Sequence, residues 1–557
     1  MKKILLLSIA LLLGTLSWAQ IAPHKYFIRF TDKKNSPYSI KHPEQFLTQR
    51  ALDRRARFGI PIKENDLPVN PSYVKAVEGT GVKILNTTRW LNGVTVYTTD
   101  TALIDSIRSF PFVQKTVKIT PAKQVSDKFK KESLLPKGKL FAFKASDTLE
   151  AQYGAALTQI KQINGIALHK KGFKGKGMVI AVLDAGYSAV PTQPLFQKLR
   201  DEHRILGTRD FVNPGGDVYP QHYHGRMVLS CMAADLPGIM VGTAPAASFW
   251  LLRTEDAPTE NVIEEYNWVS GAEFADSVGA DIINSSLGYI DFDDTTFSHP
   301  YSDMNGKTCI STIGAEMAAS KGILVVNSAG NSGNNQKFPW IGAPADGDSV
   351  LTAGAVDANG NRASFSSIGP TYDGRIKPTL MAMGQGDAVA NGSDSVTRAS
   401  GTSFSSPVLA GMCACLWEAH PKATNMQIIE ALKKTASLTA DPNALMGWGI
   451  PDFARADAYL TQWLGIPASH SKRVALHAFP NPFGNRFSVT LPQNVSGKVR
   501  FTLFSLAGKP LYSKMFYGVQ QSISVHGDIL SHLPAGIYLM QLTTTSGKLY
   551  NGKILKQ

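Results

Sequence analysis

The middle of this 557-residue chain alternates short apolar runs with segments of helical periodicity. The apolar runs are typical of strands that are buried on both faces of a sheet. Buried strands that alternate with helices predict a parallel, doubly wound sheet with right-handed crossovers, so the predicted fold class of this segment is α/β. Strands are predicted at residues 178–183, 248–252, 281–286, 323–327 and 350–356, and helices near 224–234, 262–277 and 315–321 and from 403 onwards.

Different patterns flank this segment on both sides. Residues 20–150 combine strand-like runs at 25–30 and 93–97 with a basic, helix-prone stretch at 44–57, which indicates an α+β unit. After a polar linker at residues 465–473, short strands and Gly or Asn-Pro turns recur and predict a small β-sandwich over 474–557. In that last part only strands are predicted, at residues 486–491, 498–506, 537–543 and 548–555.

The excess of basic residues lies entirely outside the middle segment. Residues 1–150 hold 25 Lys and Arg against 12 Asp and Glu, residues 151–464 hold 22 against 30, and residues 465–557 hold 10 against 1. A basic N-terminal unit docked on an acidic middle unit would explain this division by electrostatic complementarity, and solubility is the alternative explanation. The basic residues are not interleaved with stacking aromatics, so no nucleic-acid partner is expected.

Residues 1–19 have the layout of a secretory signal peptide. Lys2 and Lys3 precede the apolar run 4–13, and small residues stand at Ser17 and Ala19, ahead of a cleavage site near residue 20. A membrane anchor is the alternative, but a span needs about 20 apolar residues and this run is shorter. The sequence therefore predicts a secreted or cell-surface protein without a membrane span.

Four short motifs place reactive side chains at strand ends and helix starts. The first, VLDAG at residues 182–186, puts Asp184 at the end of an apolar strand, where an unpaired carboxylate is costly. A histidine held in one tautomer is the usual partner of such a carboxylate, and plain loop capping is the alternative. The second motif, His224-Gly225, opens a predicted helix and supplies that histidine, with His222 as a competitor for the role.

The GTSFSSP motif at residues 401–407 supplies a nucleophile. Ser403 lies at the predicted helix start, where backbone N–H groups stabilise a negative oxygen, and a neighbouring imidazole would accept its proton. Gly401 permits close approach of a substrate, and Pro407 is expected in the first helical turn, where its missing N–H costs nothing. A simple helix N-cap is the alternative role for Ser403.

The SAGNSG motif at residues 328–333 supplies a hydrogen-bond donor. The Asn331 amide follows a predicted strand and can donate to a developing oxyanion, although Asn-Ser-Gly is also an ordinary turn sequence. Each motif has such an alternative explanation singly. The order Asp, His, Asn, Ser on these elements nevertheless favours an acid, a base, an oxyanion donor and a nucleophile of one catalytic site.

With these motifs, residues 151–464 resemble the subtilisin-like serine peptidases, or subtilases. The resemblance extends to Ile283-Asn284-Ser285-Ser286-Leu287-Gly288 and to the block at residues 363–369. It implies a subtilisin-like fold, Asp184, His224 and Ser403 as the triad, and Asn331 with the Ser403 N–H as the oxyanion hole. It also implies an endopeptidase whose substrate is a polypeptide. The substrate would pair with one segment of the chain and lie between it and a second segment that forms the other wall of the specificity pocket. Those substrate-binding residues are Ser286, Leu287, Gly288, Ser328, Ala329 and Gly330.

The flanking units have resemblances of their own. Residues 20–150, particularly Tyr26–Asp32 and Arg50–Arg57, resemble the prosegments of subtilases from Bacteroidetes-type bacteria, which implies a zymogen whose own prosegment is its partner. The Lys-rich, hydrophobic-poor residues 128–139 predict an exposed, cleavable linker.

The C-terminal region contains Phe479-Pro480-Asn481-Pro482-Phe483, the turn Leu533-Pro534-Ala535-Gly536 and a basic tail. With these features residues 474–557 resemble the C-terminal sorting domain of the type IX secretion system, which implies that this machinery is a second partner. A carbohydrate- or protein-binding β-sandwich is the alternative for this region.

The triad chemistry implies no required cofactor and no catalytic metal. Subtilases often bind calcium, to which the acidic stretch 291–294 could contribute, but its spacing matches no defined loop and a solvated turn is expected. The main departure from the family pattern is Arg226, a bulky cation close to His224. Because of this departure, a catalytically inactive surface binding protein with a subtilase fold remains the alternative function. An exopeptidase remains an alternative to the endopeptidase. An esterase is not supported, because no G-x-S-x-G motif surrounds Ser403. The sequence leaves the disulfide pairing of the cysteines undecided.

Overall fold

The computed structural model describes residues 24–119, 149–392, 395–465, 476–491, 495–505, 510–519, 521–544 and 549–557. The chain divides into two compact units, residues 1–463 and 464–557. The predicted signal peptide, the predicted cleavable linker at 128–139 and residues 466–473 of the second predicted linker lie outside the described residues.

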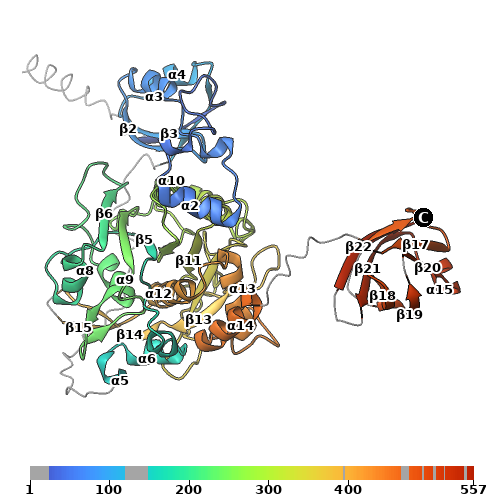
Figure 1. Ribbon diagram of the computed structural model, residues 1–557. Coiled ribbons are helices and arrows are strands. Elements are labelled where there is room, and N and C mark those ends of the chain that lie inside the picture. The colour runs from blue at the N-terminus through green and yellow to red at the C-terminus, as the bar shows by residue number, and fades with distance from the viewer. Residues whose placement is uncertain are drawn as a thin grey trace, which may run out of the picture. The chain divides into compact units, whose positions relative to one another are not determined.

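A seven-stranded sheet forms the centre of the first unit, in the order β13-β12-β11-β10-β5-β9-β6 (Figure 1). Every neighbouring pair is parallel, which confirms the predicted α/β class. The five predicted strands are its five central members, because their apolar residues are buried by helices on both faces. The strands are β5 (Val179–Asp184), β6 (Ile205–Asp210), β9 (Ser248–Arg253), β10 (Ile282–Ser285), β11 (Leu324–Ser328), β12 (Leu351–Val356) and β13 (Leu380–Met383).

Four helices carry or support the predicted motifs. Helices α9 (His224–Ala233) and α12 (Thr402–Ala419) begin at the predicted histidine and one residue before the predicted serine. Helix α10 (Ile263–Ser277) lies where expected, whereas α11 (Ile310–Ser320) begins five residues before the predicted start, because the polar Ser311 and Thr312 open it with buried hydrogen bonds to Glu265 and Asp346. The hairpin of β14 (Gln385–Ala390) and β15 (Val396–Ser400), which packs on α9 and leads into α12, was not predicted.

The N-terminal part of the first unit is the predicted α+β arrangement. Its four-stranded sheet has the order β2-β3-β1-β4, and every neighbouring pair is antiparallel. The strand-like runs 25–30 and 93–97 are β1 and β3, and the basic stretch forms most of α2. The elements are β1 (Lys25–Phe30), α2 (Gln49–Phe58), α3 (Pro71–Glu78), β2 (Lys83–Thr88), β3 (Gly93–Tyr97), α4 (Thr101–Arg108) and β4 (Val113–Lys118).

Helix α2 lies beside α10 of the central α/β part, and their contact is electrostatic (Figure 1). The carboxylate of Asp276, which is fully buried near the end of α10, accepts hydrogen bonds from Arg54 at 2.5 Å, Arg55 at 2.9 Å and Arg89 at 2.6 Å. Arg50 pairs with Asp281 at the rim of the same contact. The complementarity predicted from the charge distribution is therefore present where basic N-terminal residues meet acidic residues of the central part.

The C-terminal unit is an antiparallel β-sandwich, as predicted. Its sheets have the orders β16-β17-β20 and β19-β18-β21-β22, and their inner faces share one apolar core. The expectation of strands only is wrong in one place, because residues 528–531 form a single helical turn that buries Leu530. The elements are β16 (His477–Phe479), β17 (Arg486–Thr490), β18 (Gly497–Phe504), β19 (Pro510–Val519), β20 (Ser522–His526), α15 (Asp528–Ser531), β21 (Gly536–Thr544) and β22 (Leu549–Lys556).

The described residues settle two smaller questions. All four cysteines are free, buried thiols, and burial raises the pKa of each, so they are poor nucleophiles. None of the helices among the described residues combines the length and apolarity that a membrane crossing requires.

A buried carboxyl group lies in the β14–β15 hairpin. Asp387 of β14 is fully buried, and neither of its carboxylate oxygens has a hydrogen-bond partner among the described residues. Burial raises the pKa of Asp387 to about 8, although the charge of Arg398 opposes the shift. The side chain is therefore mostly protonated at neutral pH in the folded protein.

We expect Asp387→Asn to stabilise the protein at alkaline pH. The unfolded chain releases this proton near its ordinary pKa of 3.8, whereas the folded protein holds it to about pH 8, so wild-type stability falls as pH rises through that window. The neutral amide removes this loss. The free energy of unfolding of the variant should exceed that of wild type by several kcal/mol at pH 9, about 1.4 kcal/mol for each of the roughly four pH units between the two pKa values, and should match it near pH 4, as measured by urea unfolding. An equal difference at both pH values would contradict a buried neutral carboxyl.

Candidate active site

The carboxylate of Asp184 and the imidazole of His224 are joined directly. Asp184 is the last residue of β5 and is fully buried, and both of its oxygens lie within hydrogen-bond distance of His224 Nδ1, at 2.9 and 3.0 Å. The Ala185 N–H also donates to the carboxylate at 2.7 Å. This arrangement fixes the plane of the imidazole and, with Nδ1 protonated, leaves Nε2 free to accept a proton.

A glycine lets α9 approach the end of β5 closely enough for this contact. A Cβ atom on Gly225 would lie 2.4 Å from the Gly186 carbonyl oxygen and 3.0 Å from the Cβ of Asp184. Any larger residue would therefore push the first turn of α9, and His224 with it, away from Asp184. The glycine after the histidine is thus a packing requirement of the pair.

Ser403 is the second residue of α12, and its backbone carbonyl accepts a hydrogen bond from the residue that follows strand β10. Because α12 begins at Thr402, Pro407 is the sixth residue of the helix and not part of its first turn as expected. Its missing N–H would have bonded to the Ser403 carbonyl, four residues earlier. The Ser286 hydroxyl donates to that carbonyl instead, at 2.8 Å. Ser286 thus replaces the helical hydrogen bond that Pro407 removes.

The hydroxyl of Ser403 faces the cleft but does not bond to His224. It donates to the Ser286 carbonyl at 3.5 Å, and among the described residues no hydrogen bond joins it to the imidazole. Hydrogen bonds between a nucleophile and its base are often long or absent without substrate and form on binding.

The side chain of Asn331 is oriented by Thr402. Its Oδ1 accepts hydrogen bonds from both the backbone N–H and the hydroxyl of Thr402, each at 2.9 Å. A backbone N–H can only donate, so the amide oxygen must face Thr402 and the Nδ2 group must point the other way. A Cβ atom on Gly401 would lie 3.6 Å from that Nδ2, and Gly401 has φ +155°, which favours glycine. The glycine keeps the space beside the amide donor open.

Nine of the ten residues predicted for the site line one cleft of about 240 Å³; Asp184 lies buried behind His224. Each wall segment lies at or directly after a strand of the central sheet: residues 286–288 follow β10, and 328–330 begin at the last residue of β11. Nine further residues line the cleft: Ala185, His222, Ile290, Ser332, Gly342, Ser400, Gly401, Thr402 and Phe404. Of these, Ile290, Gly342 and Ser400 lie outside the sequence motifs and carried no signal, because loops and a strand end bring them to the cleft.

Two residues that raised questions in the sequence have other partners. His222 lines the cleft, but its Nδ1 accepts the backbone N–H of His224 at 3.3 Å, whereas His224 Nδ1 bonds to Asp184 at 2.9 Å. Arg226 is buried and donates to the Ser188 carbonyl at 2.9 Å and hydroxyl at 3.0 Å. Arg226 is not among the described residues that line the cleft.

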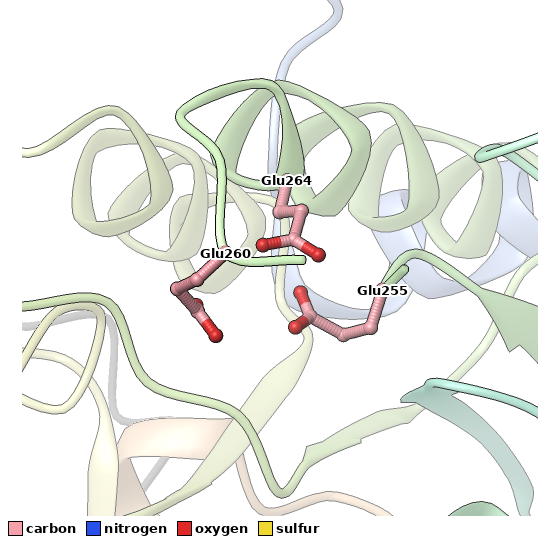
Figure 2. A group of neighbouring side chains, drawn as sticks. All are labelled: Glu255, Glu260 and Glu264. Carbon is pink, nitrogen blue, oxygen red and sulfur yellow. The ribbon is translucent and has the colours of Figure 1, made fainter. Parts of the chain in front are cut away.

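Among the described residues, one group of carboxylates has oxygen atoms close enough to share a hard cation. Glu255, Glu260 and Glu264 offer oxygens that lie within 4.8 Å of one another (Figure 2). Donors from the protein already satisfy part of this group: Tyr289 donates to Glu255 at 2.5 Å, and the Asp256 N–H donates to Glu264 at 2.9 Å. The acidic stretch 291–294 behaves as the expected turn, in which Asp294 caps a short helix.

Comparison with protein families assigns three segments of the chain. Residues 175–449 match the model of the subtilase family, which covers the central sheet and every cleft residue named above. Residues 25–134 match the Peptidase S8 propeptide domain of Bacteroidota, and residues 477–557 match a secretion system C-terminal sorting domain.

Individual relatives align with between about half and three fifths of the chain. Subtilisin NAT from Bacillus subtilis subsp. natto is 30% identical over 329 residues, which are 58% of this chain and 78% of that protein. Subtilisin DY from Bacillus licheniformis is 30% identical over 290 residues, 52% of this chain and 92% of that protein. A thermostable alkaline protease from Halalkalibacterium halodurans is 28% identical over 298 residues, 53% of this chain and 72% of that protein.

Proposed function

The chain belongs to the subtilase family of serine peptidases, and from this premise we propose that Asp184, His224 and Ser403 form the catalytic triad of a secreted endopeptidase. The observation that carries the proposal is the hydrogen bonding of a buried carboxylate to the imidazole of His224, which lines the same cleft as Ser403. The chain order Asp, His, Ser is that of subtilisin, which supports the same assignment.

In the proposed reaction Ser403 Oγ attacks the carbonyl carbon of the scissile peptide bond while His224 Nε2 accepts its proton. The imidazolium then gives this proton to the leaving amine, the C–N bond breaks, and an acyl ester remains on Ser403. Water hydrolyses the ester with His224 again as the base. Asp184 fixes the tautomer and stabilises the imidazolium at Nδ1. Every step uses protein groups and water, so the reaction needs no cofactor.

The Asn331 amide and the Ser403 N–H are proposed to stabilise the oxyanion of the tetrahedral intermediates. Thr402 turns the Nδ2 group away from itself and so toward the open side of the cleft. The Ser403 N–H belongs to the first turn of α12, whose N–H groups lack partners within the helix. Two donors fixed before substrate arrives stabilise the developing charge without reorganisation.

Asn331→Ala should lower kcat by about 10²–10³, with a small change in KM, because the lost hydrogen bond strengthens only as the oxyanion forms. Steady-state kinetics on a peptide amide measure this effect. Asn334→Ala, an exposed asparagine in the same loop, serves as the matched control and should leave kcat unchanged. An unchanged kcat in Asn331→Ala would remove this residue from the oxyanion site.

The walls of the cleft suit an extended polypeptide. The backbones at residues 286–288 and 328–330 are proposed to pair with or flank the substrate chain, as in strand addition. Leu287, Ile290 and Ala329 supply an apolar lining, and His222 and His224 are the titratable groups among the described residues that line the cleft. We therefore expect preference for uncharged, apolar side chains at the cleaved bond.

The proposed domain order is a signal peptide at 1–19, a prosegment at 20–150, the catalytic domain at 151–464, a linker at 465–473 and a sorting domain at 474–557. The basic residues of the prosegment that pair with Asp276 support its role as a bound partner of the catalytic domain. The sorting domain directs the chain to the outside or the surface of the cell.

Digestion of an unfolded protein tests the peptidase class. The processed wild-type enzyme should release internal peptides, identified by mass spectrometry, whereas release of single amino acids would indicate an exopeptidase. Absence of hydrolysis by the correctly processed chain would favour the inactive binding protein, the second candidate. The hydrogen bonds of Arg226 to Ser188 weaken the sequence argument for that candidate.

A further inference from the structure

The outer face of the larger sheet in the C-terminal unit carries a contiguous set of apolar side chains. Ile537 of β21 and Leu555 of β22 lie directly opposite each other and are 48% and 41% exposed. Leu539, two residues along β21, faces the same side and lies opposite the partly exposed Phe504 of β18. We call these four residues, Phe504, Ile537, Leu539 and Leu555, the apolar patch.

The sandwich does not need the apolar patch for its own core. The alternate residues of β21, Tyr538, Met540 and Leu542, point inward and are buried with the other core residues of the unit. The patch lies on the opposite face of the same strand. A contiguous, exposed apolar surface on a folded domain commonly marks a site of interaction with another molecule.

Two basic residues lie on the same face of the sheet as the apolar patch. Lys553 lies opposite Leu539 across the β21–β22 pair, and the exposed Arg500 lies opposite Thr543, on the same face as Leu539. Over residues 465–557 there are 10 Lys and Arg against a single acidic residue, Asp528. A partner for this face therefore needs apolar side chains at its centre and carboxylates at its rim.

We propose that the apolar patch is the surface by which the secretion machinery binds this chain, through an acidic, apolar-centred surface of one of its components. The match of residues 477–557 to a sorting domain requires that some surface of this unit be recognised during export, and the apolar patch with its basic rim has the required chemistry. The inference rests on the export role of the unit and not on the triad.

Export of the full chain from a bacterium with a type IX system tests the proposal. The double variant Ile537→Ser/Leu555→Ser should lower the fraction of the protein found at the cell surface and in the medium at least tenfold, as measured by immunoblotting. Ile529→Ser is the matched control, because this isoleucine of α15 is 47% exposed and lies outside the apolar patch. The control should be exported like wild type. Immunodetection scores location only, so the result is independent of whether Ser403 is the nucleophile.

Lys553→Glu tests the basic rim and leaves the apolar patch intact. It should also lower export, because a carboxylate would face the carboxylates of the partner. If the double variant no longer shows the thermal unfolding transition of the sandwich, the domain has not folded. In that case the export of Lys553→Glu alone tests the proposal. Normal export of the folded variants would overturn the proposal.

Discussion

Ser403→Ala should abolish peptide hydrolysis, with a loss in kcat on the order of 10⁶, the scale found when the triad serine of the related subtilisin is removed. The variant loses the atom that forms the acyl ester, while Asp184, His224 and the cleft walls stay in place. Because the precursor could not cut itself by this route, the prosegment should also remain attached. Both effects are measured on purified protein, by kinetics on a peptide amide and by the length of the chain.

Ser405→Ala is the matched control for this variant. Ser405 lies in the same helix, and its hydroxyl donates only to the Thr402 carbonyl, at 3.0 Å, so its loss should leave kcat within a few-fold of wild type. Substantial hydrolysis by Ser403→Ala would mean that another group is the nucleophile. Equal loss in both variants would indicate damage to the first turn of α12.

Asp276→Ala should lower the stability of the precursor by about 3–5 kcal/mol, the usual cost of removing one partner from a buried ion pair. Arg54 and Arg55 are each 2% exposed, and both depend on Asp276, as does Arg89. Asp66 would still pair with Arg55, but Arg54 would keep only backbone carbonyl partners. We therefore expect the prosegment to bind less tightly to the central α/β part.

Denaturant unfolding of the Ser403→Ala precursor measures this loss without self-cleavage. The control is Asp105→Ala, which removes an exposed ion pair with Arg108 on the prosegment and should cost no more than about 1 kcal/mol. A loss below about 1 kcal/mol in Asp276→Ala would contradict the view that this carboxylate holds the two parts together.

The sequence predicts the five central strands because burial on both faces leaves a continuous apolar run. Strand β6 was missed because it is the edge of the sheet, where only Asp210 is fully buried. The four residues of β13 form a run too short to separate from a loop. Periodicity therefore identifies the centre of a parallel sheet better than its edges.

At the candidate site, sequence motifs contain the side chains that are proposed to react but not all of those that orient them. The motifs contain Asp184, His224, Asn331 and Ser403, which the fold brings to one end of the sheet. The replacement of the Pro407 hydrogen bond by Ser286 could not be predicted, because it joins residues more than a hundred positions apart. Likewise, the opposite net charges of residues 1–150 and 151–464 predict that the prosegment docks on the catalytic domain. They do not identify Asp276 as the carboxylate that three arginines share.

The most direct test of the central claim is the site of covalent labelling by a fluorophosphonate. This probe reacts with a serine hydroxyl that an adjacent base activates, and mass spectrometry of the digested, labelled protein identifies the residue that carries it. The proposed triad predicts a single label on Ser403 in the processed wild type and none in His224→Ala. A label on another residue, or no label on the processed protein, would contradict the assignment of this chain as an active peptidase.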